Sequence, residues 1–260
     1  MCIRDRHKSQ HFYFKYILPY IIKKCKAVFT VSYTVKRDIC RYYHVSDDFV
    51  QVIPNAISDN VIKINEKTRA SRENKAPYLL VVGAGYPHKN IHELLKMYKY
   101  WYKNYALKIV SHRGEYGRYL ERIVREENLE KKVRFLGGVS KERLVYLYKN
   151  CDALVYPSLL EGFGIPPLEA LLYKKPIILS DISVFREVFE DAGIYIKFQD
   201  AESWEDAFKI LRNKDVLQKK IENGNKVLEK YNWKENGKKL RDVLLHLEPG
   251  LKGALKDEYR

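Results

Sequence analysis

Short apolar runs alternate with longer segments of helical periodicity from residue 76 onward. Each run is almost continuously apolar, and the segments between runs are roughly ten to fifteen residues long. Strands of a parallel sheet have this character because helices cover both faces of the sheet. The pattern predicts an α/β fold with a doubly wound parallel sheet. The expected strands are Tyr78–Val82, Leu107–Val110, Val133–Leu136, Ala153–Tyr156, Ile177–Ser180 and Ile194–Ile196, with helices at 90–104, 115–128, 140–150, 166–174 and 184–190.

A smaller group of elements precedes this region, and a helical region follows it. Residues 27–33 predict a strand, Thr34 to about Tyr43 a helix, and Val50–Ile53 a second strand. Residues 203–247 have helical periodicity with a break near 231–233. The opening six residues fit no periodicity, so we expect a truncated start.

The composition indicates a folded protein with an uneven basic excess. The 260 residues include 48 Lys and Arg against 33 Asp and Glu, a net charge of +15. Residues 1–75 carry 15 of the basic and 7 of the acidic groups. Such an excess fits an anionic membrane surface, a nucleic acid, a diphosphate ligand or simply solvated lysines, and charge alone does not choose. The four cysteines lie far apart without C-x-x-C spacing, which favours reduced thiols in a cytosolic protein and no metal site.

The segment Phe12–Ile22 is rich in aromatic and aliphatic residues, and lysines follow it. It is too short, too charged and too interrupted by Pro19 to span a bilayer, and no run of 18 apolar residues occurs elsewhere. An aromatic and basic helix of this kind suits the surface of an anionic membrane. It equally suits packing against other protein.

A glycine-containing turn follows the first strand of the sheet region. Gly83 and Gly85 would let the backbone approach a ligand, and Lys89 would add a positive charge near the start of the next helix. The turn lacks the G-x-G-x-x-G pattern and the acidic residue that follows it by about 20 positions in nicotinamide-binding folds. Taken alone, this turn is also consistent with Lys89 being a solvated lysine beside the start of a helix, with no ligand.

Two glutamates eight positions apart flank a second glycine-containing turn. Glu161 follows the Ala153–Tyr156 strand, and Glu169 is expected in the first turn of a proline-started helix. Backbone N–H groups at such a turn bind phosphates. Carboxylates repel phosphates, but they accept hydrogen bonds from the hydroxyl groups of a sugar or ribose. The helix dipole alone would account for Glu169. It leaves Glu161 without a structural explanation.

The segment Ser158-x-x-Glu161-Gly162-Phe163-Gly164-x-Pro166-Pro167-Leu168-Glu169-Ala170 resembles the E-x7-E signature of retaining glycosyltransferases of the GT-B fold. The resemblance is to family 4, which includes bacterial mannosyltransferases and other lipopolysaccharide and polysaccharide enzymes. It extends from about Ala27 to Leu247. Further matching segments are Val82–Asn90, Val133–Ser140, Leu154–Ser158, Lys175–Ile178 and Ser183–Val188.

The resemblance implies a role for each matched residue. Lys89 and Glu161 are the implied catalytic residues, on the donor diphosphate and the donor hexose respectively. Glu169 would hold the ribose. The other implied donor-binding residues are Gly83 at the diphosphate, Val139 at the base, and Gly162, Phe163 and Gly164 at the hexose or phosphate. No metal and no cofactor is expected, and the transferred sugar would retain its anomeric configuration.

The resemblance also implies the domain organisation and the partners. The sheet would be the Rossmann-like donor domain of a GT-B enzyme, with a remnant of the N-terminal acceptor domain; whether this fragment is active is left open. A nucleotide-sugar donor and a glycan or lipid-linked acceptor are expected, in the cytoplasm or at the inner face of the membrane, with no nucleic acid. The expected division is 1–57 (acceptor-domain remnant), 58–76 (linker), 77–232 (donor domain), 233–247 (helix returning to the N-terminal domain) and 248–260 (tail).

One residue departs from the family pattern, and the donor and two alternative functions stay open. Many relatives have an arginine where Ala84 stands, so Arg113 or another cation would have to replace it. GDP-mannose is the first expected donor and a UDP-hexose the second. A glucan synthase or phosphorylase of GT-B fold is a second enzyme hypothesis, and a basic nucleic-acid-binding module is a hypothesis of another class.

Overall fold

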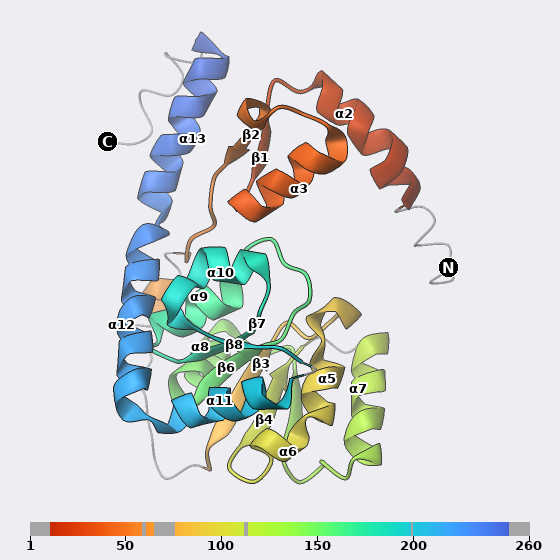
Figure 1. Cartoon of the computed structure of the whole chain (residues 1–260), viewed down its shortest axis with the longest axis vertical. Coiled ribbons are helices and arrows are strands. Elements are labelled where there is room, and N and C mark those ends of the chain that lie inside the picture. Colours follow the sequence, from red (N-terminus) through yellow and green to blue (C-terminus); the bar gives the residue numbers. More distant parts are fainter. Residues whose placement is uncertain (1–10, 59–60, 65–75, 112–113, 199, 250–260) are drawn as a thin grey trace. The chain divides into compact units, whose positions relative to one another are not determined.

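The computed structural model describes residues 11–58, 61–64, 76–111, 114–198 and 200–249, and it divides into two compact units (Figure 1). The first unit combines Met1–Pro54 with Lys234–Arg260, and the second is Asn55–Trp233. Among the described residues each unit contains its own parallel sheet.

The sheet of the second unit confirms the expected α/β class. Its described part has six strands, all paired in parallel, in the order β5-β4-β3-β6-β7-β8. The strands form where the apolar runs predicted them. The central strands β3, β6 and β7 are buried on both faces, whereas the edge strand β5 is mostly half-buried and exposes Arg134. They are β3 (Tyr78–Val82), β4 (Ala106–Val110), β5 (Val133–Gly137), β6 (Ala153–Tyr156), β7 (Ile177–Ser180) and β8 (Gly193–Ile196).

Three helices of this unit, α8, α11 and α12, begin at residues whose side chains cap them. Ser140 Oγ accepts the amide N–H of Arg143, three residues into its helix, at 3.2 Å. Asp200 and Asn213 cap the following helices in the same way. The helices are α5 (Ile91–Lys96), α6 (Tyr98–Trp101), α7 (Glu115–Glu126), α8 (Lys141–Asn150), α9 (Ile165–Leu172), α10 (Ser183–Phe189), α11 (Ala201–Arg212) and α12 (Lys214–Lys230).

The prediction of a continuous helix at 90–104 is wrong. The chain forms a 3-10 turn, η3 (Pro87–Lys89), then α5 and α6, with a break at Met97. The indole N–H of Trp101 donates to the Leu94 carbonyl at 3.0 Å, and this carbonyl would pair with the amide of residue 98 in an unbroken helix. Burial of the Trp101 ring thus takes precedence over helical periodicity.

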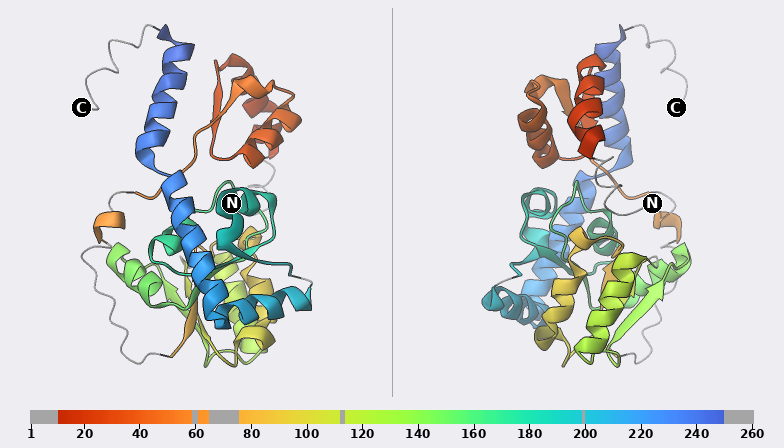
Figure 2. Two further views of the ribbon diagram at one scale, coloured as in Figure 1. Left: turned by 60° about the vertical axis from the view of Figure 1, so that its left-hand side comes forward. Right: turned by 90° about the vertical axis from the view of Figure 1, so that its right-hand side faces the viewer.

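Helices cover both faces of the sheet, as a doubly wound fold requires. One face packs on α5, α6, α7 and α11, of which α5 and α7 lie side by side (Figure 2). On the other face α9 packs on β6 and β7 and also contacts α12, while the Tyr78 hydroxyl donates to the Leu147 carbonyl of α8 at 2.7 Å. The fully buried residues of the first face include Leu79, Val81, Leu94, Leu107, Trp101 and Trp204.

The first unit joins two segments that are far apart in the sequence. Strands β1 (Val28–Thr30) and β2 (Val50–Val52) pair in parallel, and α3 (Tyr33–Tyr43) connects them in the sequence. The buried Asn236 side chain of α13 (Trp233–Leu247) donates to the Pro54 carbonyl at 2.8 Å, and Lys26 forms an ion pair with Glu248. The remaining elements of this unit are the π-helix η1 (Tyr13–Ile17), α2 (Leu18–Lys24) and η2 (Asp47–Phe49).

Parts of the expected linker and tail lie outside the described residues. Of the expected linker 58–76, residues 61–64 form a single helical turn, whereas 59–60 and 65–75 are not described. Of the expected tail, 250–260 is not described, and neither are the opening six residues. Within the described ranges no helix has both the length and the apolar composition needed to cross a bilayer.

The start of α9 yields a prediction about stability. Gly164 has φ +106°, and an added Cβ would lie 3.1 Å from ring carbons of Phe185 and Phe189, both fully buried. We expect Gly164→Ala to lower the free energy of unfolding by at least about 2 kcal/mol, from backbone strain and displaced rings. Urea unfolding followed by the fluorescence of the buried tryptophans of the second unit measures this change.

Gly117 provides the matched control. It lies inside α7 with no atom within 4 Å of an added Cβ, so Gly117→Ala should raise the free energy of unfolding by about 1 kcal/mol. Equal stability of Gly164→Ala and the wild type would contradict the assignment of Gly164 as a residue that must be glycine.

Candidate functional site

The strand order places a topological switch point between β3 and β6. From β3 the chain adds β4 and β5 on one side, and it then returns to add β6, β7 and β8 on the other. Loops leaving the carboxyl ends of two such neighbouring strands diverge, and open α/β sheets bind ligands in the crevice between them. The loop after β3 carries Lys89 and the loop after β6 carries Glu161, so both lie at this point.

Lys89 and Glu161 are in direct contact. Lys89 Nζ donates to Glu161 Oε1 at 2.5 Å and to the Tyr156 hydroxyl at 2.8 Å. The ammonium group also lies 5.0 Å from the centre of the Tyr156 ring. The structure thus brings together the two residues that the sequence analysis assigned to catalysis, and it adds a tyrosine at the end of β6.

Backbone constraints hold the two loops in place. Gly83 turns the chain away from β3 with φ +82°, and Asn90, with φ +58°, starts α5 directly after Lys89. The amide of Leu159 donates to the carbonyl of His88 at 2.8 Å, which joins the two loops one residue before Lys89. The Ser180 hydroxyl donates to the Ser158 carbonyl and fixes the second loop to the end of β7.

The pair is shielded from solvent without being closed off from it. The side chains of Lys89 and Glu161 are 16% and 13% exposed. At this exposure a ligand can reach both groups, yet solvent screens their charges poorly. Burial, followed by the negative charge of Glu161, raises the pKa of Tyr156, so its hydroxyl stays protonated at neutral pH.

Glu169 lies beyond the first turn of its helix, which corrects the sequence expectation. The helix starts at Ile165, with Gly164 as its N-cap, and no acidic residue lies in its first turn. The Glu169 carboxylate instead accepts the Tyr148 hydroxyl at Oε2, 2.9 Å away. Burial raises the pKa of Glu169, which is opposite to the effect that a helix dipole would have. The dipole therefore does not explain a carboxylate here.

The residues between the two glutamates have different environments. Gly162 is half-buried, and Gly164 is buried behind the start of α9. The Phe163 side chain is buried and packs edge-on against the Tyr231 ring, with centres 5.0 Å apart. Phe163 therefore anchors the loop to the end of α12 through its ring, and only its backbone remains a candidate for ligand contact.

Other sequence candidates lie further from the pair or outside the described residues. Val139 is half-buried after β5, and β4 separates β5 from β3. Ala84 is buried in the core, so its side chain points away from the mouth of the sheet. Arg113, the suggested replacement for the missing arginine, is not among the described residues. The described part of the chain holds no cluster of three or more His, Cys, Asp or Glu placed to bind a metal ion.

Tyr156 and Tyr148 were not among the site residues predicted from the sequence. Tyr148 lies on the buried side of α8 and Tyr156 ends a buried strand, so both read as core residues. The available signal was chemical: a buried tyrosine hydroxyl usually needs a hydrogen-bond partner. In both cases the partner belongs to the site.

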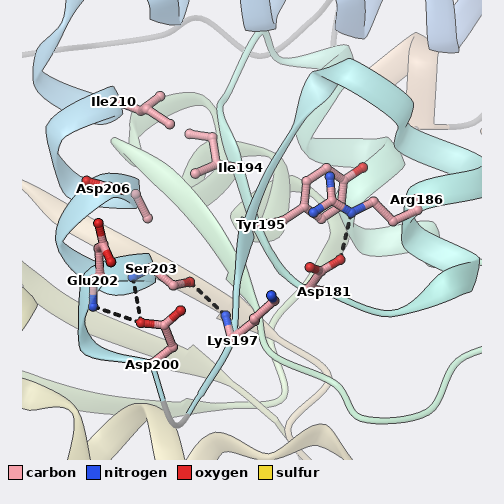
Figure 3. Close-up of a pocket in the computed structure, with 11 residues that line it drawn as sticks. Asp181, Arg186, Ile194, Tyr195, Lys197, Asp200, Glu202, Ser203, Asp206 and Ile210 are labelled. Atoms are coloured by element: carbon pink, nitrogen blue, oxygen red, sulfur yellow. Dashed lines mark hydrogen bonds and ion pairs between the residues drawn. The ribbon is translucent and has the colours of Figure 1, made fainter.

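A separate cavity of about 300 Å³ lies between β8 and α11 and contains none of the predicted site residues (Figure 3). An ion pair between Arg186 and Asp181 lies in its lining. Arg186 Nε donates to Asp181 Oδ1 at 2.6 Å, and the guanidinium stacks 3.7 Å from the centre of the Tyr195 ring. This contact lowers the pKa of Asp181. The cavity therefore lies along the edge strand, away from the switch point.

The sequence relatives are glycosyltransferases. O-antigen chain mannosyltransferase RfbU of Salmonella typhimurium (strain LT2) is 40% identical over 224 residues, which cover 86% of this chain and 61% of that protein. O-antigen chain mannosyltransferase B of Escherichia coli is 30% identical over 185 residues, which cover 66% of this chain and 48% of that protein. The chain thus spans less than two thirds of the length of these relatives.

Solved structures share the fold. Sucrose-phosphate synthase from Thermosynechococcus elongatus superposes with a TM-score of 0.75 at 21% identity, covering 90% of this chain and 61% of that one. Anabaena HepE in complex with UDP-glucose gives a TM-score of 0.71 at 16% identity, covering 85% and 64%. These are glycosyltransferases of GT-B fold, and the family described as glycosyl transferases group 1 matches residues 63–227. The chain therefore belongs to the glycosyl transferases group 1 family.

Proposed function

We propose that the switch-point site binds a nucleotide-diphosphate sugar and that the protein transfers its hexose to a glycan or lipid-linked acceptor with retention of anomeric configuration. Mannose from GDP-mannose is the first proposed donor sugar, in keeping with the names of the O-antigen relatives, and a UDP-hexose is the second. The observation that carries the proposal is the 2.5 Å contact between Lys89 and Glu161 at the switch point.

The pairing of opposite charges suits a ligand with both a diphosphate and hydroxyl groups. A lone carboxylate at the mouth of the sheet would repel a diphosphate, and the Lys89 ammonium offsets its charge. Glu161 retains lone pairs that can accept hexose hydroxyls. Gly83 leaves open space where a side chain would stand, so a diphosphate could approach the backbone there. Glu169 would accept the hydroxyls of the ribose, and Val139 would contact the base.

The proposed reaction uses the same groups in its transition state. The bond between the anomeric carbon and the diphosphate oxygen breaks, and its electron pair leaves with the diphosphate. The acceptor hydroxyl oxygen bonds to the anomeric carbon on the same face, and its proton passes to the departing diphosphate. Negative charge grows on the diphosphate, so the Lys89 ammonium stabilises the transition state more than the ground state. The proposal requires no metal ion or cofactor.

A panel of donors tests the function. GDP-mannose, UDP-glucose, UDP-galactose and UDP-N-acetylglucosamine are each added to the chain, and the melting temperature is measured. A ligand at about 100 times its Kd stabilises the folded state by about 2.7 kcal/mol, which raises the melting temperature by several degrees. We expect one donor, GDP-mannose first, to give this shift. No change of melting temperature with any of the four would contradict an intact donor site. A salt-sensitive shift of labelled DNA in gel electrophoresis would favour the nucleic-acid hypothesis.

Lys89→Ala tests the site within that experiment. The variant should lose most of the donor-induced shift and lower sugar transfer by roughly 10²- to 10³-fold, because one fixed donor to the diphosphate is gone. Lys96→Ala is the control, since Lys96 is an exposed lysine of the following helix that pairs with Glu93. Circular dichroism checks that both variants fold. A wild-type response from Lys89→Ala would remove Lys89 from the mechanism.

We also propose a cytoplasmic location with peripheral contact to an anionic membrane, through the aromatic and basic surface of residues 11–24. Four aromatic rings of this surface are more than half exposed, and its charged groups are lysines without an acidic residue among them. Such a surface suits the interface of a bilayer, where each lysine near anionic lipid contributes about 1 kcal/mol. The rings are those of Phe12, Phe14, Tyr16 and Tyr20, and the lysines are Lys15, Lys23 and Lys24.

Co-sedimentation with vesicles measures this contact. We expect binding to vesicles that contain phosphatidylglycerol but not to phosphatidylcholine alone, with binding that weakens as salt increases. The double substitution Phe14→Ser and Tyr20→Ser should abolish sedimentation. Tyr42→Ser, which changes a tyrosine as exposed as Tyr20, should not. Wild-type sedimentation of the double variant would contradict the proposed surface.

A further inference from the structure

A buried tyrosine of α8 contacts the second glutamate of the site. Tyr148 is 1% exposed, and its hydroxyl donates to Glu169 Oε2 at 2.9 Å. The same hydroxyl lies 3.4 Å from the carbonyl of Pro166, in the first turn of α9. A hydroxyl has one hydrogen to donate, and the shorter contact with a charged acceptor is the stronger one. Tyr148 therefore links α8 to the carboxylate across the start of α9.

The surrounding packing holds this hydroxyl in place. The Tyr148 ring stacks on the Tyr173 ring, with centres 5.3 Å apart and planes inclined by 19°. Both rings are buried, and Tyr173 lies directly after α9, the helix that carries Glu169. A hydroxyl fixed in this way can select one orientation of the carboxylate. It engages Oε2 and not Oε1, so the two oxygens of the carboxylate are not equivalent.

We propose that Tyr148 is a positioning residue that orients the Glu169 carboxylate to accept the vicinal hydroxyls of the ribose of a nucleoside diphosphate. The inference rests on the proposed function, in which Glu169 contacts the ribose. Tyr148 itself touches no substrate in this arrangement. Its contribution is to hold an acceptor that would otherwise rotate, so that less freedom is lost when the nucleotide binds.

The hydrogen bond also acts on the charge of Glu169. Burial raises the pKa of this carboxyl, and the hydrogen bond from Tyr148 lowers it, which offsets part of the effect of burial. Burial first, and the charge of Glu169 after it, raise the pKa of Tyr148 and Tyr173. Among the described residues, β7 and α12, which also pack on α9, contribute nothing to the shift of Glu169. Tyr148, Tyr156 and Tyr173 stay protonated, so Glu169 is the group of this set that gains a proton as the pH is lowered.

Nucleotide binding should depend on pH through the charge of Glu169. Ribose hydroxyls donate to the charged carboxylate, so binding of the nucleotide weakens as pH falls through the pKa of Glu169. Tyr148→Phe removes an interaction that favours the charged form, which raises this pKa further. The loss of affinity in the variant should then begin at a higher pH than in the wild type.

The test compares two nucleotides that differ in their ribose hydroxyls. Calorimetry measures the Kd of GDP and of 2′,3′-dideoxy-GDP for the wild type and for Tyr148→Phe, with UDP and its dideoxy analogue as a second pair. We expect Tyr148→Phe to weaken GDP about tenfold at about pH 8 and more at about pH 5.5, and to change dideoxy-GDP by less than about twofold. An equal loss for both nucleotides would indicate a merely structural role and overturn the inference.

Tyr173→Phe is the matched control. It removes the hydroxyl of the adjoining ring, and this hydroxyl has no hydrogen-bond partner among the described residues. The two variants therefore make the same chemical change in one stacked pair of rings. Tyr173→Phe should keep the wild-type preference for GDP over its dideoxy analogue and the wild-type pH profile. A loss of that preference equal to the loss in Tyr148→Phe would contradict the specific role of Tyr148.

Glu169→Gln separates a failure of the inference from a failure of the proposed function. This variant should lose the preference for GDP and the acid dependence, and adding Tyr148→Phe to it should cause no further loss of either. If Glu169→Gln kept the preference, the ribose assignment of the proposed function would fall. If Glu169→Gln lost it while Tyr148→Phe kept it, the ribose assignment would stand and the positioning role would be refuted.

Discussion

The ion pair between Lys89 and Glu161 is the interaction on which the site depends. Its partners come from loops separated by 72 residues, and they meet only because β3 and β6 are neighbours in the sheet. Charges at this degree of burial are unfavourable when unpaired, because the protein interior solvates them poorly. The position of each loop is therefore coupled to the position of the other, and a change in either would expose or isolate a charge.

Three tyrosine rings extend this arrangement into the sheet domain. Tyr156 receives the second hydrogen bond from Lys89, while Tyr148 holds Glu169 with its ring against Tyr173. All three are largely buried, so their rings pack as core residues while two of their hydroxyls reach the site. Core packing and site geometry are thus not independent. Tyr148 holds Glu169 directly, whereas Tyr156 acts on Glu161 through Lys89.

The sequence predicted the strands well because a run buried on both faces has few alternatives. Tyr78–Val82, Ala153–Tyr156 and Ile177–Ser180 form as expected. The meeting of Lys89 with Glu161 also followed, since both come after strands of one parallel sheet. Contacts decided by the direction of a side chain were not predictable. Nothing in the local sequence shows that Trp101 takes the Leu94 carbonyl and breaks a helix, or that a core tyrosine donates its hydroxyl to Glu169.

The first unit is discontinuous in the chain. Asn236 of α13 donates to the carbonyl of Pro54, and the residues of the second unit lie between them in the sequence. During synthesis the ribosome releases the six strands of the second unit before it releases α13. The sheet domain can therefore fold cotranslationally while the N-terminal strands wait for their partner helix. Until α13 emerges, the Pro54 carbonyl lacks the side-chain donor that it has in the folded unit, so the first unit is completed after the sheet domain.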